Sequence, residues 1–182
     1  YIGGGEESYG YLAGDFVRGK DAVIACSLVA EAAAVAKNEG KSLYDVLVDT
    51  YVEYGMYKES LCSIEKEGKA GKEAIKAMMD NFRANPPKEL NGSPVAYIKD
   101  YGQSITTDCK TGKTEKIDLP KSNVLQFFAE DGSKVTASPS GTEPLIKFYF
   151  GVKTKINSKA ELKQADEELN KKIEGLKKSL GI

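Results

Sequence analysis

The chain has 182 residues, a length that accommodates one domain or two small ones. Its 26 basic and 27 acidic residues give a formal net charge of -1, which does not indicate the basic face of a nucleic-acid-binding protein. The sequence contains no histidine, so imidazole is excluded from acid–base catalysis and from metal binding.

No apolar run approaches the ~20 residues that a membrane-spanning helix requires. No basic segment followed by an apolar stretch marks a secretory signal at the start. The three cysteines are widely spaced and form no CxxC pair, which argues against a disulfide framework and a zinc site. We therefore expect reduced thiols, a cytoplasmic location, and neither a membrane nor a nucleic-acid partner. Because the chain opens at Tyr1 in what reads as a strand entering a glycine loop, we expect it to be a fragment.

The first half of the chain is predicted to be mainly helical. An alanine-rich helix over residues 21–38 ends before Gly40, and Ser42 is placed to cap a second helix that runs to Gly55. Partial alternation predicts a strand over residues 56–66, and helical spacing returns over residues 71–84 before Pro86 and Pro87.

The second half is predicted to consist of strands and turns followed by one long helix. Asp131-Gly132 is a hairpin signal, and Ser158 is placed to cap a terminal helix with an apolar stripe of leucines. The expected strands cover residues 95–101, 104–109, 124–128, 134–138 and 145–153. The fold class is therefore α/β followed by α+β, with one domain over residues 1–88 and another over residues 89–182.

A glycine-rich loop near the start, residues 3–10 with the sequence GGGEESYG, offers groups that bind sugar hydroxyls. Glycines let a backbone adopt positive φ and approach a ligand, while carboxylates and a hydroxyl supply acceptors and donors. The alternative interpretation is a flexible turn before a helix, because glycine and glutamate are common in solvated loops.

A second polar loop, residues 137–144 with the sequence ASPSGTEP, lies between two expected strands. Its Ser-Gly-Thr core offers two hydroxyls and closely spaced backbone N–H groups, which is the arrangement of a small anion nest, and Lys147 follows nearby. The alternative is an ordinary proline-bounded connection.

Three segments, GEESYG at residues 5–10, FVRGKDAV at residues 16–23 and PSGTEPLIKFYF at residues 139–150, resemble the α-D-phosphohexomutases, the phosphoglucomutase and phosphomannomutase family. The resemblance spans essentially the whole chain and is to the C-terminal portion of the family. It implies a partial third domain and a C-terminal domain like the TATA-box-binding protein, with a small antiparallel sheet and a long terminal helix.

The resemblance also implies roles for individual residues. Glu6 and Ser8 would recognise sugar hydroxyls, and Lys20 would approach the substrate. The phosphate of the hexose phosphate substrate would be bound by the loop and its flanks, namely Ser138, Ser140, Gly141, Thr142 and Lys147.

One position departs from the family pattern. Family members usually carry arginine immediately before the proline of the phosphate loop, and this chain carries Ser138 there. A serine hydroxyl does not reproduce the two-pronged, charged contact of a guanidinium with phosphate. Losing that contact costs roughly 1.5 to 3 kcal/mol of phosphate binding. Weak binding, a substitute cation such as Lys147, and a sequence change all remain open.

The resemblance implies an isomerase that works through a phosphoserine and a bisphosphorylated intermediate, with Mg²⁺ held by an aspartate-rich loop. The sequence contains neither that loop nor the serine loop, both of which belong to the missing N-terminal domains. We expect this chain alone to be inactive, with no metal ligands and no catalytic residues of its own. The alternatives are a stand-alone, non-catalytic phosphosugar-binding module and a catalytically retired scaffold. Glucose and mannose specificity are not separated by the sequence, although EESYG followed by RxKDAV is closer to the phosphoglucomutase branch.

Overall fold

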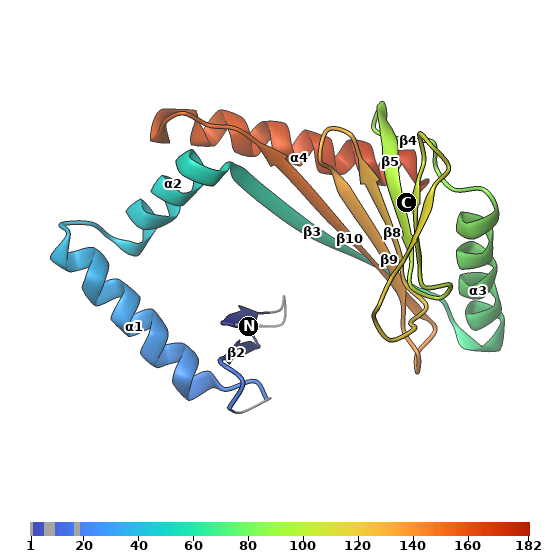
Figure 1. The fold of residues 1–182 in the computed structure, drawn as a ribbon, viewed down its shortest axis with the longest axis horizontal. Helices are drawn as coiled ribbons and strands as arrows, with labels where there is room; N and C mark the ends of the chain where they lie inside the picture. Colours follow the sequence, from blue (N-terminus) through green and yellow to red (C-terminus); the bar gives the residue numbers. More distant parts are fainter. Residues whose placement is uncertain (1, 6–9, 17–18) are drawn as a thin grey trace. The chain divides into compact units, whose positions relative to one another are not determined.

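The computed structural model describes residues 2–5, 10–16 and 19–182, and the chain forms two compact units that meet between Glu53 and Tyr54. The first unit contains a two-stranded antiparallel hairpin and two helices (Figure 1). Its elements are β1 (Gly3–Gly5), β2 (Tyr11–Ala13), α1 (Ala22–Asn38) and α2 (Leu43–Tyr54).

Both helices of the first unit begin with side-chain caps, and the one at Ser42 was predicted from the sequence. Asp21 accepts hydrogen bonds from the backbone N–H groups of Val23 and Ile24 at the start of α1. Ser42 and Asp45 form a reciprocal pair before α2, in which Ser42 Oγ accepts from the Asp45 amide and the Asp45 carboxylate accepts from the Ser42 amide. These contacts satisfy N–H groups that a helix start leaves without partners.

The second unit is an antiparallel sheet with two long helices (Figure 1). Its strand order is β3-β10-β9-β8-β5-β6-β7, and β4 pairs with β5 beside this path. The strands are β3 (Met56–Glu65), β4 (Glu89–Leu90), β5 (Ser93–Asp100), β6 (Ile105–Asp108), β7 (Thr114–Lys116), β8 (Leu125–Ala129), β9 (Lys134–Pro139) and β10 (Leu145–Thr154). The helices are α3 (Gly68–Ala84), a short 3-10 turn η1 (Lys159–Glu161) and α4 (Leu162–Ser179).

The core lies between the helices and one face of this sheet. Phe148 and Phe150 of β10 and Phe127 of β8 are fully buried, and Phe82 of α3 packs on Phe148 and Phe127 with ring centroids 6.2 and 5.9 Å apart. From α4, Ala165, Leu169, Ile173 and Leu176 are buried as the predicted stripe. Alternate residues of β10 are half-buried and point to the opposite face, as the period of a strand requires.

Several boundaries differ from the sequence expectation. Helix α3 begins at Gly68, earlier than residue 71, and the short strands β4 and β7 were not predicted. Ser158 makes no side-chain capping hydrogen bond, so its predicted role as the cap of the terminal helix is wrong: the 3-10 turn η1 precedes α4 instead.

Two further predictions concern the fold class and the domain boundary. Antiparallel sheet and helices agree with the predicted class, whereas the finer likeness to the TATA-box-binding protein stays a prediction. The predicted domain division after residue 88 also stays a prediction, and β3 and α3 belong to the second compact unit. Among the described residues, the helices are either too short or too polar to cross a membrane.

The buried stripe of α4 yields a stability prediction. Leu169→Ala removes a fully buried side chain, and we expect it to lower the free energy of unfolding by about 3 to 5 kcal/mol through lost burial and a residual cavity. Leu119→Ala is the matched control, because the Leu119 side chain is 60% exposed. Urea unfolding followed by circular dichroism measures both, and equal midpoints for the two variants would contradict the assigned core.

An ion pair between α4 and β3 yields a pH prediction. Lys58 Nζ lies 2.5 Å from Asp166 Oδ1, and this hydrogen bond is the main reason why the pKa of the Asp166 carboxyl lies below its ordinary value. A carboxyl with a lowered folded-state pKa adds stability above its unfolded pKa and loses it as the pH falls through the folded pKa. Asp166→Asn should therefore lower the urea midpoint at pH 7, and its difference from the unmodified chain should shrink as the pH falls through the lowered folded-state pKa. A difference that is constant with pH would contradict this origin.

Candidate functional site

The loop between β9 and β10 is closed by backbone hydrogen bonds at its base. The Ser140 amide donates to the Leu145 carbonyl over 2.7 Å, and the Leu145 amide donates to the Glu143 carbonyl over 2.8 Å. The Lys66 amide, just after β3, donates to the Pro144 carbonyl over 2.9 Å. The loop is therefore fixed by its own two strands and by the end of a third.

Inside this loop the donors converge on one position. Ser140 Oγ accepts from the backbone N–H groups of Thr142 and Glu143, over 3.4 and 3.2 Å, and lies 3.4 Å from Thr142 Oγ1. Two amides that point toward one acceptor resemble the donor arrangement that binds anions. The structure thus brings Ser140, Gly141 and Thr142 together, although in this conformation the two amides already have a local acceptor.

Gly141 is a glycine that the fold itself does not require. Its φ lies outside the left-handed region, and a Cβ added there would meet no atom within 4 Å. Gly132, by contrast, has φ of +83° in the β8–β9 turn, where a side chain would be strained. Close approach of a group from outside the chain gives a physical reason for glycine at position 141.

Ser138 and Lys147 face each other across β9 and β10 in the strand register. Both are half-buried, and they lie on the opposite sheet face from the buried Ala137–Phe148 pair. Directly opposed side chains have Cβ atoms about 4.5 to 5.5 Å apart, so the Lys147 side chain begins beside Ser138.

The first polar loop is described only in part. Glu6 and Ser8, the predicted hydroxyl-recognition residues, lie outside the described residues. Strands β1 and β2 flank the loop as an antiparallel pair, and the Asp21 amide donates to the Tyr11 carbonyl. Lys20 is exposed and directly precedes Asp21, so the backbone brings it next to the strand that follows the loop.

Sequence reasoning missed a buried polar network near the second loop. Asp100 accepts from Arg83 Nε over 3.0 Å and from the amides of Gly102 and Gln103, and Arg83 Nη2 donates to Asn123 Oδ1 over 2.6 Å. The side chains of Arg83 and Asp100 are 21% and 8% exposed. Arg83 and Asp100 lie on different segments of the chain, and their pairing has no local sequence pattern. The sequence alone could therefore not have revealed it.

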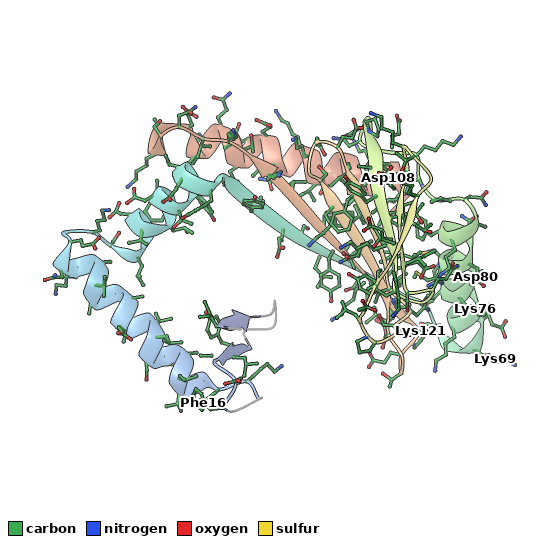
Figure 2. All side chains as sticks on the ribbon, in the orientation of Figure 1. Phe16, Lys69, Lys76, Asp80, Asp108 and Lys121 are labelled. Carbon is green, nitrogen blue, oxygen red and sulfur yellow. The ribbon has the colours of Figure 1, made fainter. Side chains whose placement is uncertain are left out.

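Helix α3 also brings cations to the loop. Lys72, Ile75 and Lys76 of α3, together with Asn123, line a cavity of about 200 Å³ whose other wall is formed by loop residues, including Ser140 and Gly141. Figure 2 shows Lys76 on α3 and, on the neighbouring strand-connecting segment, Lys121. A larger groove of about 1130 Å³ lies along β5 and the segment after α3, but it shares no residue with the loop and its walls are mainly apolar. We therefore place the site at the smaller cavity.

No group of three or more His, Cys, Asp or Glu that could hold a metal ion occurs in residues 2–5, 10–16 and 19–182. Within those ranges a magnesium ion therefore finds no set of three such ligands. What the described residues do offer is hydroxyls, amides and ammonium groups, the donors that bind an oxyanion.

Comparisons with known proteins agree with this chemistry. Residues 1–54 match the family model described as phosphoglucomutase/phosphomannomutase, alpha/beta/alpha domain III. Phosphoglucomutase from Staphylococcus haemolyticus strain JCSC1435 is 40% identical over 148 residues, and that from Staphylococcus aureus strain MRSA252 is 42% identical over 148 residues. The predicted relationship to the phosphohexomutase family is confirmed. Each alignment covers 81% of this chain and 27% of the relative, so the chain spans about a quarter of the length of these relatives.

A solved structure agrees in fold. The open form of pp63/parafusin, a phosphoglucomutase and exocytosis-sensitive phosphoprotein from Paramecium, aligns with a TM-score of 0.50 over 97% of this chain and 30% of that chain. The sequences are 15% identical, so this likeness bears on the fold alone.

The buried network yields a prediction. Asp100→Ala leaves the Arg83 guanidinium without its carboxylate and frees two turn amides, so we expect a loss of about 3 to 5 kcal/mol in the free energy of unfolding. Asp80→Ala is the control, since its ion pair with Lys76 is exposed and should contribute less than about 1 kcal/mol. Urea unfolding of both variants measures the contrast, and a loss at Asp100 no larger than at Asp80 would contradict the structural role.

Proposed function

We propose that this chain is the substrate-recognition part of a phosphohexomutase that interconverts hexose 1-phosphate and hexose 6-phosphate, phosphoglucomutase more readily than phosphomannomutase. The observation that carries the proposal is the loop at residues 140–143, where two hydroxyls and two amides surround a glycine that the fold does not require. Ser140, Gly141 and Thr142 bind the phosphate that does not react. Ser138 and Lys147, on the strands that flank the loop, reach this phosphate from the sheet face opposite to the one that α3 covers.

The sugar is recognised by the first loop. Glu6 and Ser8 bind ring hydroxyls, and Lys20 approaches the substrate. Binding energy from the phosphate and the hydroxyls, both remote from the reacting oxygen, holds that oxygen against the phosphoryl donor. The proposed parts are a third domain over residues 1–88 and a phosphate-binding domain over residues 89–182, which resembles the TATA-box-binding protein.

Phosphoryl transfer itself requires groups outside this set. In the proposed whole enzyme, which is cytoplasmic, a phosphoserine donates the phosphoryl group and Mg²⁺ neutralises charge, both in other domains. The chain by itself binds the substrate without turning it over.

A chimera tests this proposal directly. The matched 148-residue region of Staphylococcus aureus phosphoglucomutase is replaced by the corresponding residues of this chain. The chimera should convert glucose 1-phosphate to glucose 6-phosphate in a coupled assay, whereas the chain alone should not. A folded chimera that binds glucose 6-phosphate but has no activity would support a non-catalytic binding module instead.

Within the active chimera, Ser140→Ala and Thr142→Ala should each lower kcat/KM by about ten- to a hundredfold, the value of one lost hydrogen bond to a charged group. Thr114→Ala in the exposed strand β7 is the control and should leave kcat/KM unchanged. Unchanged kinetics in both loop variants would refute the assignment of the phosphate loop.

Gly141→Ala separates binding from folding. Because the added methyl group meets open space, the free energy of unfolding in urea should stay within about 0.5 kcal/mol of that of the unmodified chain. The same methyl group occupies the approach path of a phosphate, so phosphate affinity should fall about tenfold or more, as measured by calorimetry. A variant that binds phosphate normally would show that the glycine serves no ligand.

A further inference from the structure

The cavity between α3 and the phosphate loop reaches the loop from the helix side of the sheet. Its lining includes Ser140 and Gly141 but neither Ser138 nor Lys147, which lie on the opposite face. The volume of about 200 Å³ corresponds to several waters at ~30 Å³ each, so a phosphate group fits. An anion seated over Gly141 is therefore accessible from this side.

The charges around this cavity favour an anion. Two lysines and one glutamate line it, which leaves one net positive charge. Lys76 Nζ already pairs with Asp80 over 2.6 Å, whereas no ion pair involves Lys72 among the residues that the structure describes. Lys72 is thus the lining cation whose charge is available to a ligand.

The position of Lys72 is fixed by close packing at the start of α3. Gly71 is buried, and a Cβ there would lie 2.7 Å from the backbone of Lys66, so only glycine lets the helix approach that segment so closely. The Lys66 amide in turn donates to the Pro144 carbonyl of the loop. Lys72, the next residue after Gly71, is held beside the loop by this chain of contacts.

Asn123 adds an oriented donor. Its Oδ1 accepts from Arg83 Nη2 over 2.6 Å, and Arg83 is held by Asp100. Since an amide that accepts through its oxygen presents its NH₂ group in the other direction, Asn123 Nδ2 remains available to donate on the wall of the cavity.

We propose that Lys72 and Asn123 bind the phosphate group seated on Ser140 and Gly141, and that Lys72 supplies the positive charge that Ser138 does not. This inference rests on the proposed function and names two further recognition residues for the same site. The ligand class is a phosphate monoester or inorganic phosphate, bound by an ammonium group and an amide donor together with the loop hydroxyls.

The test is a titration of the ¹⁵N-labelled chain with inorganic phosphate and, separately, with glucose 6-phosphate, following the amide shifts of residues 140–142. Lys72→Ala should weaken both ligands about three- to tenfold, and Lys72→Arg, which keeps the charge, should stay within about twofold. Asn123→Asp keeps an acceptor for Arg83 but replaces the donor with a negative charge, so it should weaken both ligands about tenfold.

Lys69→Ala is the matched control, because Lys69 lies on the same helix but does not line the cavity. An equal loss at Lys69 and Lys72 would show general charge attraction and overturn the inference. If the unmodified chain binds and Lys72→Ala binds as well, the inference fails while the proposed function stands. If the loop amides of the unmodified chain respond to neither ligand, the proposed phosphate loop fails and the inference fails with it.

Discussion

The ten-residue antiparallel pairing of β3 with β10 is the contact on which the second unit depends. Its register runs from Met56 opposite Thr154 to Glu65 opposite Leu145, and β9 pairs with the other edge of β10. Because β10 is held on both sides, its first residue, Leu145, fixes where the β9–β10 loop ends. The same register places the end of β3 at the loop, where the Lys66 amide reaches the Pro144 carbonyl.

From that point the chain turns directly into α3, which explains how a helix comes to lie against the loop. Phe82 near the end of α3 packs on Phe148 and Phe127, while Gly71 near its start packs on Lys66. The helix is thus anchored at both ends, one by burial of aromatic rings and the other by a backbone approach that only glycine permits. Helix α3 in this way forms one wall of the cavity beside the β9–β10 loop, and no local sequence pattern predicts this wall.

Sequence predicted most of this fold because its signals were local. The first helix, the cap at Ser42 and the apolar stripe of the terminal helix each depend on residues within a few turns of one another. Strands β4 and β7 escaped prediction because they have two and three residues, too few for a period to appear. The prediction that Ser158 caps the terminal helix failed because a good capping residue can equally precede a 3-10 turn.

The candidate site likewise combines local features, which the sequence shows, with tertiary contacts, which it does not. The loop hydroxyls at Ser140 and Thr142 were readable because the motif is continuous, whereas Arg83, Asp100 and Asn123 meet only through tertiary structure. The roles of Glu6 and Ser8 stay predictions, since these residues lie outside the described part of the chain. No pattern in the sequence relates Lys72 to the loop, as 68 positions separate it from Ser140.

The serine at position 138, where the family pattern has arginine, can be explained if a cation from another segment takes over the charge. A phosphate loop needs hydroxyls and amides for orientation and at least one cation to offset the dianion, but the cation does not have to come from the loop itself. A flexible lysine on a neighbouring helix supplies charge at a higher entropic cost than a forked guanidinium, and so with lower affinity. In the proposed enzyme, moderate phosphate affinity would suit a ligand that is released after each turnover, since binding the substrate and the transition state equally tightly does not raise kcat.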